Sequence, residues 1–367
     1  MKYFIVAGEA SGDLHASNLI KEIHKKDIYA NIKVWGGDKM QKAGSDLKMH
    51  YKELAFMGFW EVFKNLFSIY NKLRLCKQHI LDFEPDIIIL IDYPGFNLRL
   101  ASFAKKRGIK IVYYISPKVW VWRSSRVKKI KKCVDRMFVI LPFEKTFYDT
   151  WNYEVTYVGN PVVDAINDYK GNGIRTDFNL DDRPIIALLP GSRKQEIEYM
   201  LPVMLNLISK YKQYQFVVSC MSSQKEVYNK IGDERNIKMI FDDPYGVLKD
   251  AKYAIVTSGT ATLETALMGV PQVVCYKANW LTFIIGKSLV DIKYISLVNL
   301  ILDKALVTEL IQAECTSDNI GIELDKMIND NIYVKNIEKG YNEIKDILGT
   351  ERVSLKVADN IIKMLSQ

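Results

Sequence analysis

Cysteine is scarce in this sequence, and the few cysteines form no pattern. The chain has five cysteines in 367 residues, and no two of them make a C-x-x-C pair. A disulfide framework and a structural zinc site therefore do not fit, and we expect a protein of the reducing cytoplasm. The cysteines are Cys76, Cys133, Cys220, Cys275 and Cys315.

Long hydrophobic runs are also missing. Charged residues such as Asp92, Lys287 and Asp291 interrupt every apolar stretch that approaches the roughly 18 residues of a membrane span. The amino-terminal residues run directly into a strand-and-turn pattern, which is not that of a cleavable signal. With 49% hydrophobic and 26% charged residues, the chain has the composition of a globular protein long enough for two domains.

Apolar runs alternate with helix-like segments in two successive halves, on either side of a polar stretch at 168–183. Because the runs are continuously apolar, they predict parallel strands that are covered by helices on both faces. We therefore expect an α/β chain of two Rossmann-like domains with parallel sheets facing across a cleft, and with ligands beyond the carboxyl ends of the strands. The runs are 3–7, 32–35, 86–91, 109–115, 136–141, 185–189, 215–220, 237–241, 253–257 and 271–276.

The same pattern gives domain ranges. We expect an N-terminal domain at 1–170, a C-terminal domain at 171–345 and a C-terminal helix at 346–367. Helix-like segments near the end of the chain are broken at Gly349. The sequence leaves open whether the last helix crosses back to the first domain or reaches a partner subunit in a homodimer.

The turn Gly191-Ser192-Arg193 lies between an apolar run and a helix-like stretch. Such a turn presents unpaired backbone N–H groups and the positive end of a helix dipole, which together bind anions. The forked guanidinium of Arg193 suits two phosphate oxygens at once, so we predict a diphosphate site. The alternative is a capped strand-to-helix turn with a surface arginine.

A second polar turn, Ser258-Gly259-Thr260, precedes another helix in the same half of the chain. Glu264 lies one turn along that helix, where a carboxylate can accept hydrogen bonds from ribose hydroxyls. The alternative is that Glu264 is the capping-box partner of Ser258 or Thr260.

The first turn of the chain, Gly8-Glu9-Ala10-Ser11-Gly12-Asp13, lacks the third glycine of G-x-G-x-x-G. Its two carboxylates would also repel a pyrophosphate, so a dinucleotide cofactor is disfavoured. Carboxylates and a hydroxyl suit sugar hydroxyls, and we predict sugar contacts from Glu9, Ser11 and Asp13. The alternative is a tight turn in which Asp13 caps a helix.

Asp92 ends the apolar run 86–91 and is followed by Tyr93-Pro94-Gly95-Phe96-Asn97. Its carboxylate is therefore expected at the carboxyl end of a buried parallel strand, where reactive groups gather. A carboxylate with apolar neighbours holds its proton more tightly and can act as a general base. The alternative is an aspartate that caps the next helix.

Several blocks occur in an order that identifies a resemblance. They are Gly8-Glu9-Ala10-Ser11-Gly12-Asp13, Asp92-Tyr93-Pro94-Gly95-Phe96-Asn97, Ser116-Pro117-Lys118-Val119-Trp120-Val121-Trp122-Arg123, Leu141-Pro142-Phe143-Glu144, Leu189-Pro190-Gly191-Ser192-Arg193, Ser258-Gly259-Thr260-Ala261-Thr262-Leu263-Glu264 and Ser296-Leu297-Val298-Asn299-Leu300. In this order, nearly end to end, the chain resembles the lipid-A-disaccharide synthases. The first and third blocks are specific to that family, whereas GT-B glycosyltransferases share the Gly-Ser-Arg and Ser-Gly-Thr blocks more loosely.

The resemblance implies a GT-B fold and an inverting glycosyl transfer in lipopolysaccharide biosynthesis. UDP-2,3-diacylglucosamine would react with the 6-hydroxyl of 2,3-diacylglucosamine 1-phosphate to give a β-1,6 disaccharide 1-phosphate and UDP. Asp92 would be the base, Arg193 and Ser192 would stabilise the leaving diphosphate, and Glu264 would hold the ribose. Asn299 matches a family position near the donor. Since no D-x-D triplet is present to hold a divalent ion, we predict neither a metal nor a cofactor.

The chain departs from the family pattern at Asn160, Gly95 and Val298, and several alternatives remain. Asn160 stands where family members often carry a histidine, so no histidine role transfers to it. A UDP-N-acetylglucosamine 2-epimerase, or another GT-B UDP-sugar transferase, would share the turns of the second half. A binding protein without catalysis would have no need of Asp92. Nucleic acid is not expected as a partner, because the basic residues come without a recognisable binding module.

Two segments suit a lipid substrate. On a helical wheel, 57–73 gathers apolar side chains over about half the circumference, which is wider than a core-facing stripe; the alternative to docking on a membrane is a buried core helix. The stretch 118–132 contains no acidic residue, and with a net charge of +8 it could attract anionic headgroups or the acceptor phosphate. We therefore expect a peripheral enzyme on the cytoplasmic face of the inner membrane. The proposed lipid contacts are Phe59, Trp60, Phe63, Phe67 and Tyr70.

Overall fold

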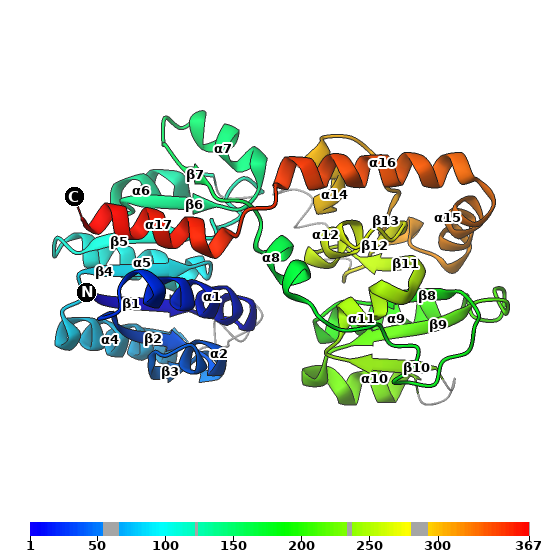
Figure 1. Ribbon diagram of the computed structural model, residues 1–367, viewed down its shortest axis with the longest axis horizontal. Coiled ribbons are helices and arrows are strands. Elements are labelled where there is room, and N and C mark those ends of the chain that lie inside the picture. Colours follow the sequence, from blue (N-terminus) through cyan, green and yellow to red (C-terminus); the bar gives the residue numbers. More distant parts are fainter. Residues whose placement is uncertain (54–65, 122–123, 233–236, 280–292, 367) are drawn as a thin grey trace. The chain divides into compact units, whose positions relative to one another are not determined.

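The computed structural model describes residues 1–53, 66–121, 124–232, 237–279 and 293–366 (Figure 1). The chain divides into two compact units: Met1–Pro161 with Glu351–Gln367, and Val162–Thr350. The first boundary lies before the predicted domain boundary at residue 170, because the helix Pro161–Asp168 belongs to the second unit apart from its first residue. The second boundary follows Thr350, five residues after the predicted one at 345.

The first unit is built on a seven-stranded sheet in which every neighbouring pair is parallel. The strand order is β3-β2-β1-β4-β5-β6-β7, so the direction of winding reverses between β1 and β4. Ala7 at the end of β1 pairs with Ile91 at the end of β4. Open α/β sheets bind their ligands at such a reversal. The strands are β1 (Lys2–Ala7), β2 (Asn31–Gly36), β3 (Asp46–His50), β4 (Ile87–Ile91), β5 (Lys110–Tyr114), β6 (Arg136–Val139) and β7 (Thr156–Tyr157).

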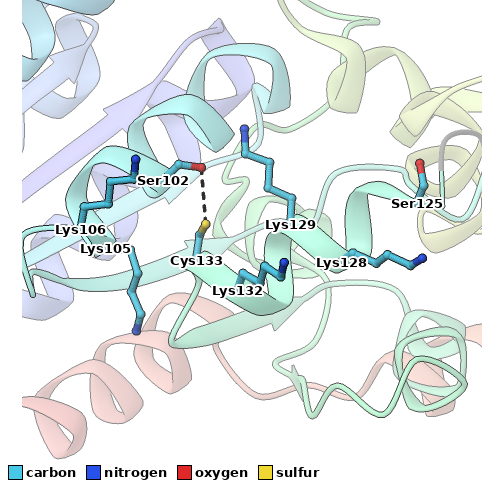
Figure 2. Close-up of a pocket in the computed structure, with 8 residues that line it drawn as sticks. All are labelled: Ser102, Lys105, Lys106, Ser125, Lys128, Lys129, Lys132 and Cys133. Carbon is cyan, nitrogen blue, oxygen red and sulfur yellow. Dashed lines mark hydrogen bonds between the residues drawn. The ribbon is translucent and has the colours of Figure 1, made fainter.

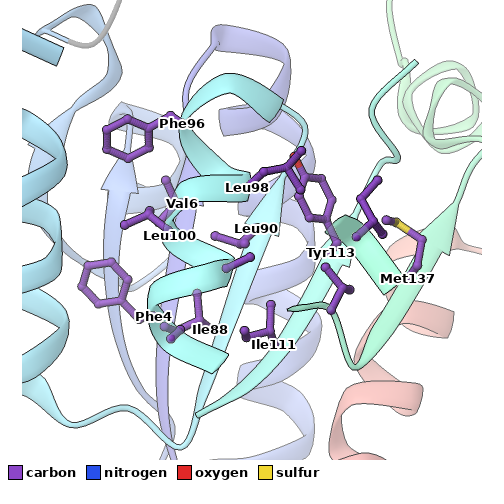
Figure 3. Packing of buried hydrophobic residues seen from close by; sticks show 14 of the residues in the cluster. Phe4, Val6, Ile88, Leu90, Phe96, Leu98, Leu100, Ile111, Tyr113 and Met137 are labelled. Atoms are coloured by element: carbon purple, nitrogen blue, oxygen red, sulfur yellow. The ribbon is translucent and has the colours of Figure 1, made fainter. Parts of the chain in front are cut away.

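Helices cover both faces of this sheet. Side chains of β4 alternate between two cores. Ile88 and Leu90 pack under one helical layer (Figure 3), whereas Ile87, Ile89 and Ile91 pack under the other. The first layer includes α4 (Leu66–Phe83), α5 (Pro94–Lys105) and α6 (Arg126–Cys133); the second includes α1 (Ala10–Lys26) and α17 (Val353–Leu365). The unit also contains α2 (Asp38–Lys42), η1 (Tyr51–Glu53) and α7 (Pro142–Asp149).

The second unit repeats this plan on a six-stranded parallel sheet, in the order β10-β9-β8-β11-β12-β13. Here the winding reverses between β8 and β11. The strands are β8 (Ile185–Leu189), β9 (Gln215–Cys220), β10 (Lys238–Phe241), β11 (Ala251–Thr257), β12 (Gln272–Tyr276) and β13 (Glu309–Ile311).

Helices again cover both faces. Ile186 and Leu188 of β8 pack in one core, and Ile185, Ala187 and Leu189 in the other. The helices are α8 (Pro161–Asp168), α9 (Lys194–Leu205), η2 (Ser222–Gln224), α10 (Lys225–Gly232), α11 (Pro244–Asp250), α12 (Thr260–Leu267), α14 (Leu297–Leu302), η4 (Gln312–Glu314), α15 (Ser317–Asn329) and α16 (Asn331–Leu348). Two parallel sheets with helices on both faces confirm the predicted α/β architecture.

The C-terminal helix α17 belongs to the first unit (Figure 1). Val353, Val357, Ala358 and Ile361 are buried in the core that α1 also lines. Full burial of one large aliphatic side chain contributes about 1.5–3 kcal/mol. The last helix therefore stabilises a domain whose other elements lie about two hundred residues or more earlier in the chain.

Ile361→Ala tests this contribution. Because Ile361 is completely buried, the substitution should leave a cavity and lower the free energy of unfolding of the first unit by about 2–5 kcal/mol. Urea unfolding followed by circular dichroism measures the change. Lys363→Ala on the exposed side of the same helix is the control and should shift stability by less than about 0.5 kcal/mol. Equal stability of the two variants would contradict the packing role of α17.

Candidate active site

Asp92 follows β4 directly, at the carboxyl edge of the first sheet. Asp92 and Tyr93 have φ values of 43° and 48°, so two consecutive residues with side chains adopt the left-handed region. Such backbone costs of order 1–3 kcal/mol per residue and persists only where the surroundings enforce it. Strain of this kind clusters at functional sites, which makes the Asp92 turn the strongest candidate in the first unit.

Hydrogen bonds to the backbone of Asp92 hold this turn in place. Its N–H donates to the Tyr114 carbonyl at 3.2 Å. Its carbonyl accepts from Asn97 Nδ2 at 2.8 Å and from the Tyr113 hydroxyl. The N-cap of α5 is Tyr93, and Asp92 therefore does not occupy the capping position that was its alternative role.

The Asp92 carboxyl has a pKa raised to about 6. Burial is the main cause, and the negative charge of Glu9 adds to it; the positive charge of Lys118 and the Tyr93 N–H act in the opposite direction. A carboxylate with such a pKa is largely ionised at neutral pH and is a stronger base than an exposed aspartate. Proximity to Glu9 agrees with the register that pairs the ends of β1 and β4.

The first turn of the chain lies against the Asp92 turn. A Cβ atom at Gly8 would come within 2.4 Å of Tyr93 Cγ, so only glycine allows this approach. Glu9, the N-cap of α1 whose charge acts on Asp92, and Ser11 are both exposed. Two of the three predicted sugar-binding residues are thus free to meet a ligand.

Asp13, in contrast, is buried and faces the backbone of another loop. Its Oδ1 accepts from the N–H groups of Gly37 at 2.8 Å and Met40 at 3.1 Å, and its Oδ2 accepts from Lys39 N–H at 3.1 Å. Asp13 therefore caps α2, a helix remote from it in sequence. This geometry matches the alternative role as a capping residue better than a direct sugar contact.

In the second unit, Gly191-Ser192-Arg193 follows β8, and Arg193 is the N-cap of α9. Gly191 has a φ of 111°, which is costly for any residue with a Cβ. The Arg193 side chain is 69% exposed. The predicted turn between a buried strand and a helix is present.

Glu196 occupies the anion-binding groups of this turn. Its Oε2 accepts from the N–H groups of Ser192 at 3.0 Å and Arg193 at 3.2 Å, and its Oε1 lies 3.3 Å from Arg193 Nη1. A Cβ at Gly191 would lie 2.6 Å from Oε2, so the carboxylate sits directly on the turn. Sequence reasoning missed this residue, although a glutamate three positions after an N-cap is the capping-box signal.

The second turn, Ser258-Gly259-Thr260, follows β11, and Gly259 is the N-cap of α12 with a φ of 155°. Ser258 Oγ donates to the Ile295 carbonyl at 2.8 Å, whereas Gly259 and Thr260 are exposed. The turn therefore leaves backbone groups at the start of α12 accessible.

Glu264 does not make the capping-box contact that was its alternative role. Its Oε1 accepts from the Tyr245 hydroxyl at 3.0 Å. Burial raises the pKa of Glu264, and the Tyr245 hydrogen bond partly opposes that shift. Tyr245, which the sequence did not single out, thus fixes the carboxyl beside the start of α12.

The side-chain amide of Asn299 makes all of its hydrogen bonds within the protein. Its Nδ2 donates to the Val307 carbonyl and to Glu309 Oε1, both at 2.9 Å. Its Oδ1 accepts from Leu306 N–H at 2.9 Å and Val307 N–H at 3.0 Å. An amide offers two donors and two acceptor lone pairs, so no capacity is left for a ligand. The geometry assigns Asn299 to loop positioning and not to direct donor contact.

Glu144 orders another loop at the carboxyl edge of the first sheet. It accepts from the N–H groups of Ile140 and Leu141 at 3.2 and 3.0 Å, and from Trp120 Nε1 at 3.3 Å. Burial is the main cause that raises the pKa of Glu144 to about 7. The nearby Asn160, whose role the sequence left open, is buried and donates to the Ile140 carbonyl at 3.3 Å.

Several predicted lipid contacts cannot be placed. Phe59, Trp60 and Phe63 lie outside the described residues, Phe67 is described only as part of α4, and Tyr70 on α4 is 65% exposed. Of the helices described here, none has both the length and the apolar character needed to span a bilayer.

Two units, each built on a parallel sheet with polar turns at its carboxyl edge, have the architecture of the GT-B fold. Solved structures share this fold: a UDP-GlcNAc 2-epimerase from Neisseria meningitidis bound to UDP-GlcNAc has a TM-score of 0.71 at 14% identity, covering 99% of this chain and 100% of that one. A crystal structure described as the glycotransferase of kitacinnamycin has a TM-score of 0.68 at 13% identity, covering 99% and 98%. At these identities the likeness concerns the fold alone.

Sequence comparison identifies the family. A family model described as lipid-A-disaccharide synthetase matches residues 3–361. The lipid-A-disaccharide synthase of Geobacter sulfurreducens is 37% identical, covering 100% of this chain and 98% of that protein; the one from Coxiella burnetii (strain Dugway 5J108-111) is 38% identical, covering 91% and 90%. The chain belongs to the lipid-A-disaccharide synthase family, which confirms the resemblance and sets the epimerase alternative aside.

Asp13→Ala separates a structural role from a sugar contact. Three backbone N–H groups would lose a charged acceptor, so the free energy of unfolding of the first unit should fall by about 1.5–3 kcal/mol in urea unfolding. Ser11→Ala, two residues earlier and exposed, is the control and should change stability by less than about 0.5 kcal/mol. Unchanged stability of Asp13→Ala would leave its carboxylate available for a ligand role.

Proposed function

We propose that this protein transfers 2,3-diacylglucosamine from its UDP derivative to the 6-hydroxyl of 2,3-diacylglucosamine 1-phosphate. The products are UDP and the β-1,6-linked lipid A disaccharide 1-phosphate. The observation that carries the proposal is the strained, partly buried Asp92 at the winding reversal of the first sheet, in a chain that matches the family over residues 3–361. Incubating the purified protein with both substrates and detecting UDP and the disaccharide tests it.

In this reaction Asp92 is the general base. Its carboxylate takes the proton of the acceptor hydroxyl while that oxygen attacks the anomeric carbon of the donor. The bond from the anomeric carbon to the diphosphate oxygen breaks, and its electron pair leaves with UDP. Attack from the face opposite the leaving group inverts the anomeric configuration. The exposed Glu9 and Ser11 are suited to bind sugar hydroxyls beside this base.

The second unit binds the donor in this proposal. The guanidinium of Arg193, the N–H groups of Ser192 and Arg193, and the start of α12 at Gly259 and Thr260 stabilise charge on the departing diphosphate. Glu264, fixed by Tyr245, accepts hydrogen bonds from the ribose hydroxyls. The diphosphate has to displace the Glu196 carboxylate, since both anions need the same N–H groups.

The location follows from the substrates. Both carry acyl chains that stay in a bilayer, whereas UDP leaves into water, so a peripheral position on the cytoplasmic face of the inner membrane is part of the proposal. Tyr70, exposed on α4, supports it among the predicted lipid contacts. A homodimer stays a prediction from the sequence.

Asp92→Asn should lower turnover by roughly 10²- to 10⁴-fold, because a neutral amide cannot take the proton from the 6-hydroxyl of the acceptor sugar. With an Asp92 pKa of about 6, wild-type kcat/KM should be on a plateau above pH 7 and fall as the carboxylate is protonated below pH 6. The residual rate of the variant should lack that acid limb. UDP affinity, measured by calorimetry, is the control and should not change. Near-normal turnover would remove Asp92 from the mechanism.

Arg193→Ala and Glu196→Gln should change UDP affinity in opposite directions. Loss of the guanidinium removes a charge-assisted contact worth about 1.5–3 kcal/mol, so binding should weaken roughly tenfold to a hundredfold. Glutamine still caps α9 but no longer competes as an anion, so binding should tighten roughly twofold to fivefold, the scale of an exposed ion pair.

Glu198→Gln is the matched control for that pair. Glu198 lies on the same helix, and in the described structure its one ion pair is with Lys194, at 3.9 Å. Removing the charge of Glu198 should therefore leave UDP affinity unchanged. Weaker binding by Glu196→Gln would mean that Glu196 positions the turn for UDP and does not compete with it. Unchanged binding by Arg193→Ala would make Arg193 a surface residue.

A further inference from the structure

Lys118 occupies the tip of a tight turn at the carboxyl edge of the first sheet. The turn follows β5, the strand that pairs with β4. The Val119 N–H donates to the Pro117 carbonyl at 2.6 Å, which closes a turn with Lys118 as its central residue. Pro117 and Val119 are buried, whereas Lys118 is exposed. The turn therefore presents the lysine side chain to solvent.

The backbone on both sides of Lys118 is anchored. Ile115 has a φ of 66°, which is an outlier for a β-branched residue and persists only where the surroundings enforce it. Ser116 is buried, and its hydroxyl lies 2.7 Å from the Tyr148 hydroxyl. Val119 packs in the core beneath α5. These anchors fix the position of the Lys118 backbone at the strand ends.

The Lys118 ammonium acts on two carboxyl groups of this edge. Its positive charge lowers the pKa of Asp92 and of Glu144, although burial has the larger effect on both groups and raises each pKa. Asp92 follows β4, Lys118 follows β5 and Glu144 follows β6, so three neighbouring strand ends bring the charges together. Within the described part of the chain, the Lys118 side chain forms neither an ion pair nor a hydrogen bond.

The acceptor of the proposed reaction carries a phosphate on its anomeric carbon. The ring oxygen links that carbon to the carbon that carries the hydroxymethyl group with the reacting 6-hydroxyl. When Asp92 takes the proton of this hydroxyl, the phosphate therefore lies within the width of one sugar ring. The charges of Asp92 and Glu9 repel a phosphate at that position, so its binding requires a cation close by. Among the described charges that shift the pKa of Asp92, the cation is Lys118.

A denser group of lysines lies elsewhere on the first unit (Figure 2). Lysines of α6, including Lys128, line a hollow against the end of α5. None of the lysines of this hollow is among the described groups that shift the pKa of Asp92. A phosphate in the hollow would lie away from the base, whereas a phosphate on Lys118 would lie beside it. The hollow is the rival site that an experiment has to exclude.

We infer that Lys118 determines acceptor specificity: its ammonium binds the anomeric phosphate of the acceptor sugar and favours a phosphorylated acceptor over a neutral one. The inference rests on the proposed function, because it assigns a role within that reaction. No bond to Lys118 forms or breaks. The exposed ammonium is hydrated before the acceptor binds, and the phosphate then replaces water as its partner.

A comparison of two acceptors tests this role. Rates are measured at about pH 8, where Asp92 is ionised, with 2,3-diacylglucosamine 1-phosphate and with the same diacyl sugar without phosphate, each in a neutral detergent. Lys118→Gln should lower the ratio of kcat/KM for the phosphorylated acceptor to that for the neutral one roughly tenfold to a hundredfold, because a charge-assisted contact is lost. The change should appear in KM for the phosphorylated acceptor. Lys118→Arg keeps the charge and should keep most of the preference.

The pH profile gives a second measurement. Lys118→Gln removes a cation that favours the ionised carboxylate, so the pKa of Asp92 should rise. The acid limb of kcat/KM should therefore move to higher pH in Lys118→Gln and stay near its wild-type position in Lys118→Arg. Glu9 is unchanged in both variants and contributes equally to both profiles. An unmoved acid limb in Lys118→Gln would contradict the position of this ammonium beside the base.

Lys128→Gln is the matched control, because it removes the same charge from an exposed lysine of the rival hollow. Its acceptor preference and its acid limb should match those of the wild type. If Lys128→Gln lowers the preference as much as Lys118→Gln does, the phosphate binds in the hollow and the inference is wrong. UDP affinity, measured by calorimetry, should be the same in all variants. Weaker UDP binding by Lys118→Gln would place this lysine at the donor diphosphate and would also overturn the inference.

Failure of the proposed function gives a different result. A wild-type protein that makes no disaccharide from either acceptor would overturn the proposed function and, with it, the role of Lys118. A wild-type protein that makes disaccharide, together with a Lys118→Gln variant that keeps the full preference for the phosphorylated acceptor, would overturn this inference alone.

Discussion

Helices cover both faces of each parallel sheet, and this constraint determines where polar chemistry can occur. Strands β4 and β8 consist of aliphatic residues that are buried on both faces of their sheets. No side chain within either strand is therefore available to a ligand. For these two strands, polar groups are therefore confined to the turns where the strands end. Asp92, Arg193 and the turn before α12 all occupy such positions.

The carboxylates in these turns differ in the hydrogen bonds that they accept from backbone N–H groups. Asp13 and Glu196 each accept backbone N–H groups at the start of a helix, which satisfies donors that would otherwise be unpaired. Asp92 receives less of this stabilisation and lies near Glu9, and its pKa rises. The first group maintains loops, whereas a carboxylate with a high proton affinity is suited to proton transfer. The number of N–H donors does not decide the pKa by itself, because Glu144 accepts two backbone N–H groups and burial still raises its pKa to about 7.

This distinction also explains what the sequence could predict. Continuous apolar runs identified both sheets, and the residue after such a run, Asp92, was identified because strand ends are local features. The roles of Asp13 and Asn299 depend on Gly37 and Leu306, in other loops that only the fold brings close. A single sequence does not show those partners. Glu196 did carry a local capping signal, but the anion-binding interpretation of Gly191-Ser192-Arg193 left no place for an internal carboxylate.

Arg193 in the second unit and the lysines of α6 in the first differ in whether a carboxylate pairs with them. Arg193 is paired with Glu196, and in the proposed function binding of a diphosphate exchanges one anion for another. Lys128, Lys129 and Lys132 have no such internal partner in the described structure, and their repulsion is reduced only by water and salt. A paired arginine selects a ligand with enough charge to displace a carboxylate. Unpaired lysines attract anions without selecting a defined geometry.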